Sequence, residues 1–95
     1  MPFVLIRHKV ANYAKWKHAV QAVKTFRKTS GEKSLYVVRS SNEPNDVTVF
    51  CAWDTAARMR KFVKSADLRK AMNEAGVVSK PEVQFFSKME DLSVG

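Results

Sequence analysis

Apolar and polar residues alternate with a period of two in four stretches of the chain and recur at helical spacing in two others. In the first stretch, residues 3–10, Val4, Ile6 and His8 fall on one face of a strand and Leu5 and Arg7 on the other. The remaining strand-like stretches span residues 34–40, 47–53 and 81–88. The pattern predicts the order strand, helix, strand, strand, helix, strand.

The first helical stretch predicts one continuous helix that starts after Asn12, a good N-cap, and ends near Thr29. The second contains two apolar stripes that do not share a phase. The stripes are Met59, Phe62, Val63 and Ala66, and then Leu68, Ala71, Met72 and Ala75. At about 100° per residue they would lie on opposite sides of one helix. We therefore expect a break near Ser65–Asp67, where both named residues are capping types.

This order predicts an α+β, ferredoxin-like βαββαβ fold with one antiparallel four-stranded sheet. The predicted sheet is apolar on both faces, as the pairs Val37 and Val38, Val49 and Phe50, and Phe85 and Phe86 show. In antiparallel sheets with one solvent-exposed face, apolar and polar residues alternate more strictly along each strand than they do here. Because one helical layer covers only one face, we expect a homodimer in which the sheets of two subunits pack together as a dimeric α+β barrel.

Composition narrows the classes of protein. The length of 95 residues suits a single domain over residues 1–95, and no apolar run is long enough for a membrane span. One cysteine, Cys51, cannot form an intramolecular disulfide, and together with the lack of a signal-like leader it predicts a cytoplasmic protein. The net charge of +8 lies mostly on the helical stretches, as on solvated helix faces. The strand at 47–53 lacks the glycine-aromatic pattern of RNA-recognition modules, which argues against a nucleic acid partner.

Several landmarks accompany this element order. They are Arg7-His8-Lys9-Val10, Tyr13, Trp16-Lys17, Asn42-Glu43-Pro44-Asn45, Trp53-Asp54, Ala75-Gly76-Val77 and Lys80-Pro81. With them the chain resembles the dimeric α+β barrel superfamily and, within it, small proteins grouped with the antibiotic-biosynthesis monooxygenases. The resemblance implies a barrel-forming dimer whose ligands sit between sheet and helices of each subunit. It leaves the reaction open, because the superfamily includes cofactor-free oxygenases, haem-degrading enzymes, aldoxime dehydratases and muconolactone isomerase.

Two residues are candidates for chemistry. His8 is in phase with Val4 and Ile6, so it faces the helix-covered side and could act as a base. The alternative is a structural histidine satisfied by a nearby backbone or carboxylate group. Arg39 could hold an anionic or enolic oxygen of a ligand, or instead pair with Asp46 or Asp54 across the hairpin.

Aromatic residues could form the walls of a pocket, although core packing is their commoner role. The candidates are Trp53, Tyr13, Phe50 and Phe85. Trp16 belongs to the apolar stripe of the first helix and is assigned to the core. Cys51 has no base beside it in the sequence, so we expect a buried thiol without a nucleophilic role. No metal-ligand spacing or phosphate-binding glycine loop is recognised, and we expect neither a metal nor a cofactor.

These residues leave several functions open. The leading hypothesis is a small-molecule-binding dimer, either a cofactor-independent monooxygenase or a related cyclase or isomerase that acts on an aromatic or enolic compound. The alternative is a non-enzymatic, stress-related or regulatory dimer. Haem binding is a weaker hypothesis, because the resemblance would require a histidine in the stretch 55–78 and an asparagine in the first strand, and both are missing.

Overall fold

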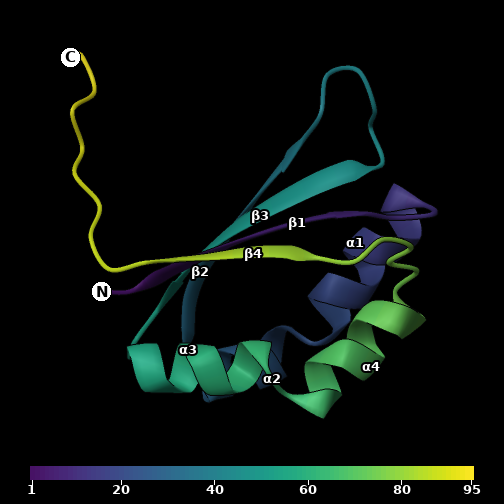
Figure 1. Ribbon diagram of the computed structural model, residues 1–95, viewed down its shortest axis with the longest axis horizontal. Coiled ribbons are helices and arrows are strands. Elements are labelled where there is room, and N and C mark those ends of the chain that lie inside the picture. The colour runs from purple at the N-terminus through teal and green to yellow at the C-terminus, as the bar shows by residue number, and fades with distance from the viewer.

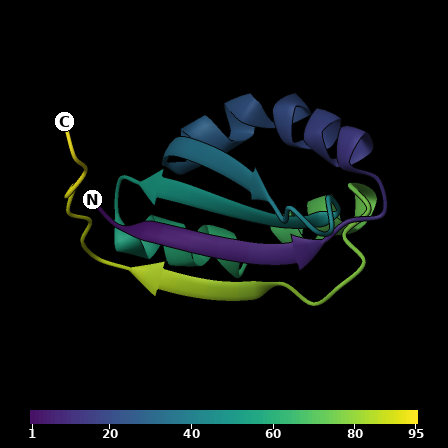
Figure 2. The same ribbon diagram turned by 90° about the horizontal axis from the view of Figure 1, so that it is seen from above.

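Four strands form one antiparallel sheet in the computed structural model, which describes residues 1–95. They are β1 (Phe3–Lys9), β2 (Glu32–Arg39), β3 (Asp46–Trp53) and β4 (Glu82–Phe86). Their spatial order is β2-β3-β1-β4, so β1 and β3 are central and β2 and β4 are edges (Figure 2). This is the ferredoxin-like arrangement that the sequence predicts.

All four helices lie on one face of the sheet (Figure 1). They are α1 (Tyr13–Ala22), α2 (Lys24–Ser30), α3 (Ala56–Val63) and α4 (Ala66–Glu74). The predicted break in the second helical region is confirmed, because Ser65 separates α3 from α4 and its side chain caps α4 by accepting from the backbone N–H of Leu68. Asn12 caps α1 in the same way, through the N–H of Lys15.

The prediction of one continuous first helix is wrong. The chain leaves helical geometry at Val23, where φ is −102° and ψ is 19°, so α1 ends before this residue and α2 begins after it. The bend lets the Arg27 side chain donate to the carbonyl of Val20 and reach Glu32 at the start of β2. Gly31 then ends α2 with a φ of 120°, where any β-carbon would clash with the Asp54 carboxylate.

The core lies between the helices and the sheet. Alternate residues of the two central strands point into it, as the sequence predicts, including Val4 and Ile6 of β1 and Val49 and Cys51 of β3. The helices contribute Trp16, Met59 and, just after α4, Ala75. No helix in the structure combines the length and the hydrophobicity needed to cross a lipid bilayer.

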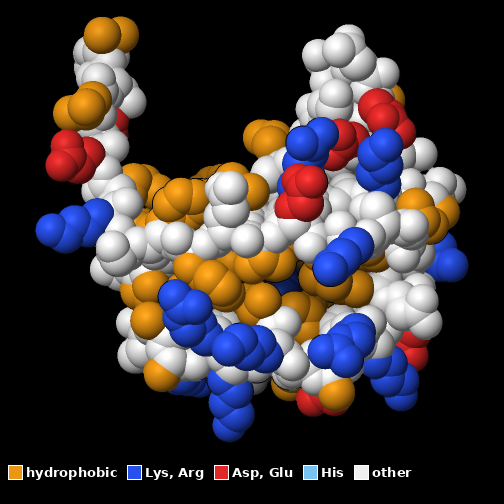
Figure 3. Space-filling model, in the orientation of Figure 1, with side chains coloured by type: hydrophobic (Ala, Val, Ile, Leu, Met, Phe, Trp, Pro, Cys, Tyr) orange, Lys and Arg blue, Asp and Glu red, His pale blue; other side chains and the backbone are white.

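The other face of the sheet, called the open face below, carries no helix (Figure 1). Its apolar side chains are Phe3, Leu5, Tyr36, Val38, Phe50, Ala52 and Phe86. Tyr36 and Val38 are 69% and 64% exposed, which is high for residues of this size in a strand. Hydrophobic side chains gather on the sheet between the β2–β3 hairpin and the C-terminal tail, two arms that rise from its ends (Figure 3).

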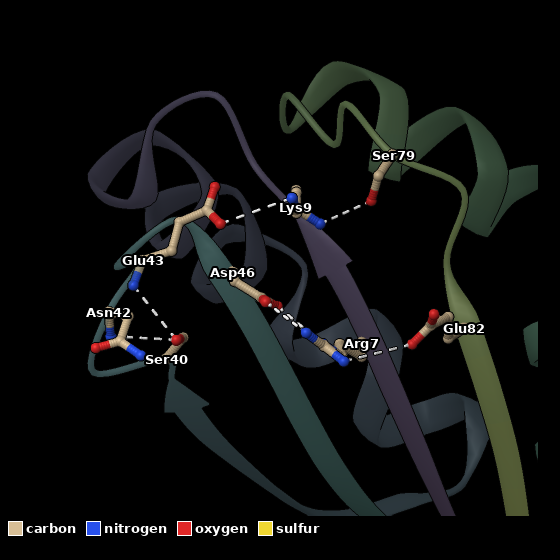
Figure 4. Close-up of polar contacts among 8 residues, drawn as sticks. All are labelled: Arg7, Lys9, Ser40, Asn42, Glu43, Asp46, Ser79 and Glu82. Carbon is tan, nitrogen blue, oxygen red and sulfur yellow. Dashed lines mark hydrogen bonds and ion pairs between the residues drawn. The ribbon is translucent and has the colours of Figure 1, made fainter.

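One end of the open face is charged, and its charges pair among themselves (Figure 4). Arg7 binds Asp46, with 2.7 Å between Nη2 and Oδ2, and lies 3.9 Å from Glu82. Lys9 lies 3.6 Å from Glu43. Arg7 keeps the pKa of Asp46 below its usual value through a hydrogen bond. This end of the face therefore presents neutralised pairs.

Candidate functional site

An interior cavity of about 110 Å³ lies between the sheet and the helices. Seventeen of its 21 lining residues are hydrophobic, so it favours an apolar guest. The four polar lining residues are His8, Arg27, Glu32 and Asp67. Among the lining side chains Val23, Phe26 and Asp67 are exposed, and they mark where the cavity reaches the surface.

His8 is buried in the wall of this cavity, on the face that the strand alternation predicts. Its ring packs against that of Trp16 at an angle of 60°, with 5.7 Å between the centroids. Neither ring nitrogen has a hydrogen-bond partner within the chain, so the alternative of a histidine satisfied by backbone or carboxylate is wrong. Burial lowers the pKa of His8, which keeps the imidazole neutral and leaves a lone pair that can accept a proton.

An aromatic wall forms another side of the cavity. Trp53, at the end of β3, is 1% exposed and lies 4.9 Å from the ring of Phe62, which in turn lies 5.9 Å from Phe26. The indole Nε1–H of Trp53 is buried and has no acceptor in the chain. A guest molecule that offers an oxygen to this N–H would satisfy a donor that is otherwise left without a partner.

A buried ion pair at the cavity wall was not among the predicted residues. Arg27 of α2 donates to the Glu32 carboxylate, and their side chains are only 15% and 7% exposed. The sequence does hold a signal for it, because Arg27 follows Val20 and Val23 at the spacing of the apolar stripe. Burial, with the nearby Glu32, raises the pKa of the Cys51 thiol. The thiol therefore stays protonated, in line with the expected buried cysteine that is no nucleophile.

The structure does not bring Arg39 to the interior cavity. Its guanidinium lies over the ring of Tyr13 at 3.6 Å from the centroid, and its Nε donates to the carbonyl of Pro44 at 2.9 Å. The suggested pairing with Asp46 or Asp54 is also wrong, since these carboxylates bind Arg7 and Arg58. The physical reason is register: Arg39 pairs with Val47 on the helix side, so the adjacent Asp46 points to the open face.

The aromatic residues predicted as pocket walls occupy three different surroundings. Of the four, Trp53 lines the interior cavity. Tyr13 lies under Arg39, and Phe85 lies on the helix side of β4 under the guanidinium of Arg60. Phe50 lies on the open face, stacked on Phe3 with 5.4 Å between centroids, because its neighbour Val49 takes the inward position. His8 and Trp53 are thus the predicted site residues that share one cavity.

The lowered pKa of His8 predicts how stability depends on pH. Between pH 7 and 5 the unfolded chain takes up a proton at His8 near its ordinary pKa of about 6.5, and the folded protein resists it. The free energy of unfolding should therefore decrease as the pH is lowered from 7 to 5, by at most about 1.4 kcal/mol per pH unit for one group. Urea unfolding of the His8→Leu variant should show a flatter profile. The exposed His18→Gln variant should keep the wild-type slope, and an unchanged profile in His8→Leu would contradict the prediction.

No protein-family model matches the chain, and no curated protein matches it in sequence. Solved structures do match. A candidate antibiotic biosynthesis monooxygenase from Bordetella bronchiseptica superposes with a TM-score of 0.76 at 19% identity, over 94% of this chain and 97% of that one. SnoaB, a cofactor-independent oxygenase from Streptomyces nogalater, superposes with a TM-score of 0.75 at 14% identity, over 96% and 95%.

A third match, a candidate antibiotic biosynthesis monooxygenase from Deinococcus radiodurans, has a TM-score of 0.69 at 13% identity and covers 100% of this chain and 99% of its own. The chain has the fold of the antibiotic biosynthesis monooxygenases. The family resemblance in the sequence is confirmed at this level. At these identities the superpositions show the shared architecture over nearly whole chains, and the residues in the cavity have to carry any argument about chemistry.

Proposed function

We propose that the protein binds an uncharged aromatic or enolic small molecule in the interior cavity and that His8 removes a proton from it. The observation that supports this most is an apolar cavity whose wall holds buried nitrogen atoms of His8 and Trp53 without partners. Buried polar atoms in native proteins almost always have hydrogen-bond partners. A ligand with a hydroxyl group and a carbonyl oxygen could supply both missing partners. Its hydroxyl would donate to a ring nitrogen of His8, and its carbonyl would accept from the indole N–H of Trp53.

Charge and size limit the class of ligand. The charge of Arg27 is neutralised by Glu32, and burial keeps His8 neutral, so the wall offers little to balance a charged guest. An engineered protein cavity of about 150 Å³ holds one benzene molecule. The cavity of about 110 Å³ therefore suits a compound of about one ring unless side chains at its mouth move.

The proposed chemistry starts with proton transfer. The hydroxyl proton of a phenol or enol moves to a ring nitrogen of His8, which becomes imidazolium, and the ligand becomes an electron-rich enolate. An enolate of this kind can react with dioxygen without a cofactor. In such a monooxygenation a methylene carbon becomes a carbonyl with one oxygen atom, and the other atom leaves as water with the two hydrogens. Without dioxygen, transfer of the proton from His8 to a carbon of the enolate would convert the enol into its keto isomer, which is an isomerase reaction.

We also propose that the protein works as a homodimer through its open face. The apolar part of that face exposes Tyr36, Val38 and Phe86 to solvent, and the charges at its other end are already paired (Figures 3 and 4). A surface without uncompensated cations fits a second copy of itself better than it fits a polyanion. Packing two open faces together would leave each interior cavity on the outer, helical side of its own sheet.

The test is a ligand screen followed by one substitution. Single-ring phenols and cyclic enols are screened by ligand-observed NMR, and hits are titrated against tryptophan fluorescence, since Trp16 and Trp53 line the cavity. We expect His8→Ala to lower turnover, measured as substrate loss with and without dioxygen, by about 10²-fold or more. The affinity should change less, and His18→Ala should behave as wild type. Unchanged turnover in His8→Ala would refute the base, and binding without turnover in the wild type would favour the non-enzymatic dimer.

A further inference from the structure

A second hollow lies on the outside of the subunit, along the free edge of β2. This groove, of about 690 Å³, is lined by residues of α1, α2 and β2. It is lined by four lysines, Lys17, Lys24, Lys28 and Lys33, and is called the lysine groove below. None of the four makes an ion pair in the structure. The groove has one carboxylate, Glu32, which Arg27 already neutralises.

The C-terminal tail, residues 87–95, has the complementary charge. It follows β4 as an extended segment that leaves the body of the subunit (Figures 1 and 2). In a chain with a net charge of +8, this segment carries Glu90 and Asp91 against Lys88 alone. It also exposes apolar side chains that a lone subunit leaves in water, including Leu92 at 84%. An extended apolar segment of this kind is expected to lie against another surface.

From this charge and shape complementarity we infer that the tail of one copy docks in the lysine groove of a second copy. The inference rests on the proposed homodimer. The tail and the β2–β3 hairpin rise on the same side of the sheet, at its two ends (Figure 1). When two open faces pack about a twofold axis that runs across the line from tail to hairpin, the tail of one subunit reaches the hairpin end of its partner. From there it can run along the edge strand β2 toward Lys33 at the other end of that strand.

The edge of β2 gives the tail a way to bind. An edge strand has unpaired backbone N–H and C=O groups, and an extended peptide can add to it as a further strand. Glu90 and Asp91 would then lie beside the groove lysines, which supply the specificity for an acidic segment. By symmetry the same contact forms twice in the dimer.

Docking of the tail would also complete the ligand site. The lysine groove and the interior cavity share Arg27 and Glu32, together with Trp16, Val20 and Leu35, so these residues form the wall between them. The tail of the partner would cover the outer side of this wall and shield the Arg27–Glu32 pair from water. Each interior cavity would then depend on both subunits.

Cross-linking in a mixed dimer tests the contact directly. Full-length protein grown with ¹⁴N is mixed with ¹⁵N protein, treated with a zero-length carbodiimide, digested and examined by mass spectrometry. We expect links from Glu90 or Asp91 to Lys24, Lys28 or Lys33 in which the two peptides carry different isotopes. Glu74, an exposed carboxylate on α4, is the matched control and should form no such links. Tail links confined to one isotope, or absent from a dimer, would overturn the inference.

Charge-reversal variants provide an independent test, in which the dissociation constant of the dimer is measured. We expect Glu90→Lys with Asp91→Lys to weaken the dimer about tenfold at low salt, and Lys24→Glu with Lys28→Glu to do the same. All four substitutions together should restore it to within about threefold, and 0.5 M salt should shrink every difference. A dimer insensitive to both pairs refutes the tail contact and leaves the proposed homodimer standing. A wild-type protein that sediments as a monomer refutes both.

Discussion

If the protein forms the proposed homodimer, replacing Phe50 with Asp should leave it a folded monomer at micromolar concentration. Phe50 lies at the centre of the open face, opposite Leu5 of β1 and Tyr36 of β2. Its ring stacks on Phe3 and lies 6.4 Å from that of Phe86. A carboxylate placed there would lose its hydration on dimerisation and would meet its own copy near the twofold axis. The dissociation constant of the dimer should rise by at least about 10²-fold, which corresponds to about 2.7 kcal/mol of binding free energy.

Sedimentation velocity over a range of concentrations measures the change, and far-UV circular dichroism checks that the variant is folded. The matched control is Phe26→Asp, which places the same charge on another exposed phenylalanine, but on the helical side. That variant should remain a dimer. If Phe50→Asp stays a dimer while folded, the open face is not the interface, and the proposed barrel-forming assembly is wrong.

The sequence predicts this fold well because each signal that it uses is local. Alternation in the first strand is enough to place Val4, Ile6 and His8 on one face, and the structure has them there. The break between α3 and α4 could also be predicted, because two apolar stripes out of phase cannot both be buried by one straight helix. Ser65, a helix-capping residue, then indicates where the break between the two helices occurs.

The features that the sequence did not predict depend on side-chain contacts and strand register, which hydrophobic periodicity does not report. The bend at Val23 leaves the apolar spacing of the helix almost unchanged, so periodicity cannot reveal it. After the bend, Arg27 donates to Glu32 at the start of β2 and to the carbonyl of Val20. Likewise, Arg39 and Asp46 look like partners along the chain, but strand register directs them to opposite faces.

For the candidate site, the sequence predicts which strand side chains face inward. It does not predict which of them line the same cavity. His8 and Trp53 come from central strands whose direction alternation fixes, and both line the cavity. The other predicted wall residues, Tyr13, Phe50 and Phe85, do not line it. Their positions depend on how the helices lie over the sheet and on which face each residue occupies, and these follow from tertiary packing.

Breaking the Arg27–Glu32 pair should cost more stability than removing any other ion pair in the protein. The side chains are 15% and 7% exposed, against 48% and 23% for Arg58 and Asp54. Removal of one partner leaves the other charge buried without compensation, which in proteins typically costs about 3–5 kcal/mol. We therefore expect Arg27→Met and Glu32→Met each to lower the free energy of unfolding by about this amount. Urea denaturation of the purified variants measures it.

The double variant distinguishes the desolvated charge from lost packing. With Arg27→Met and Glu32→Met together, no charge stays behind in the wall, so the loss should be smaller than for either single variant. Arg58→Met is the matched control at an exposed pair and should cost about 1 kcal/mol or less. Additive losses in the double variant would mean that the two side chains act by packing alone. In that case the pair would not be the neutral wall element on which the preference for an uncharged ligand depends.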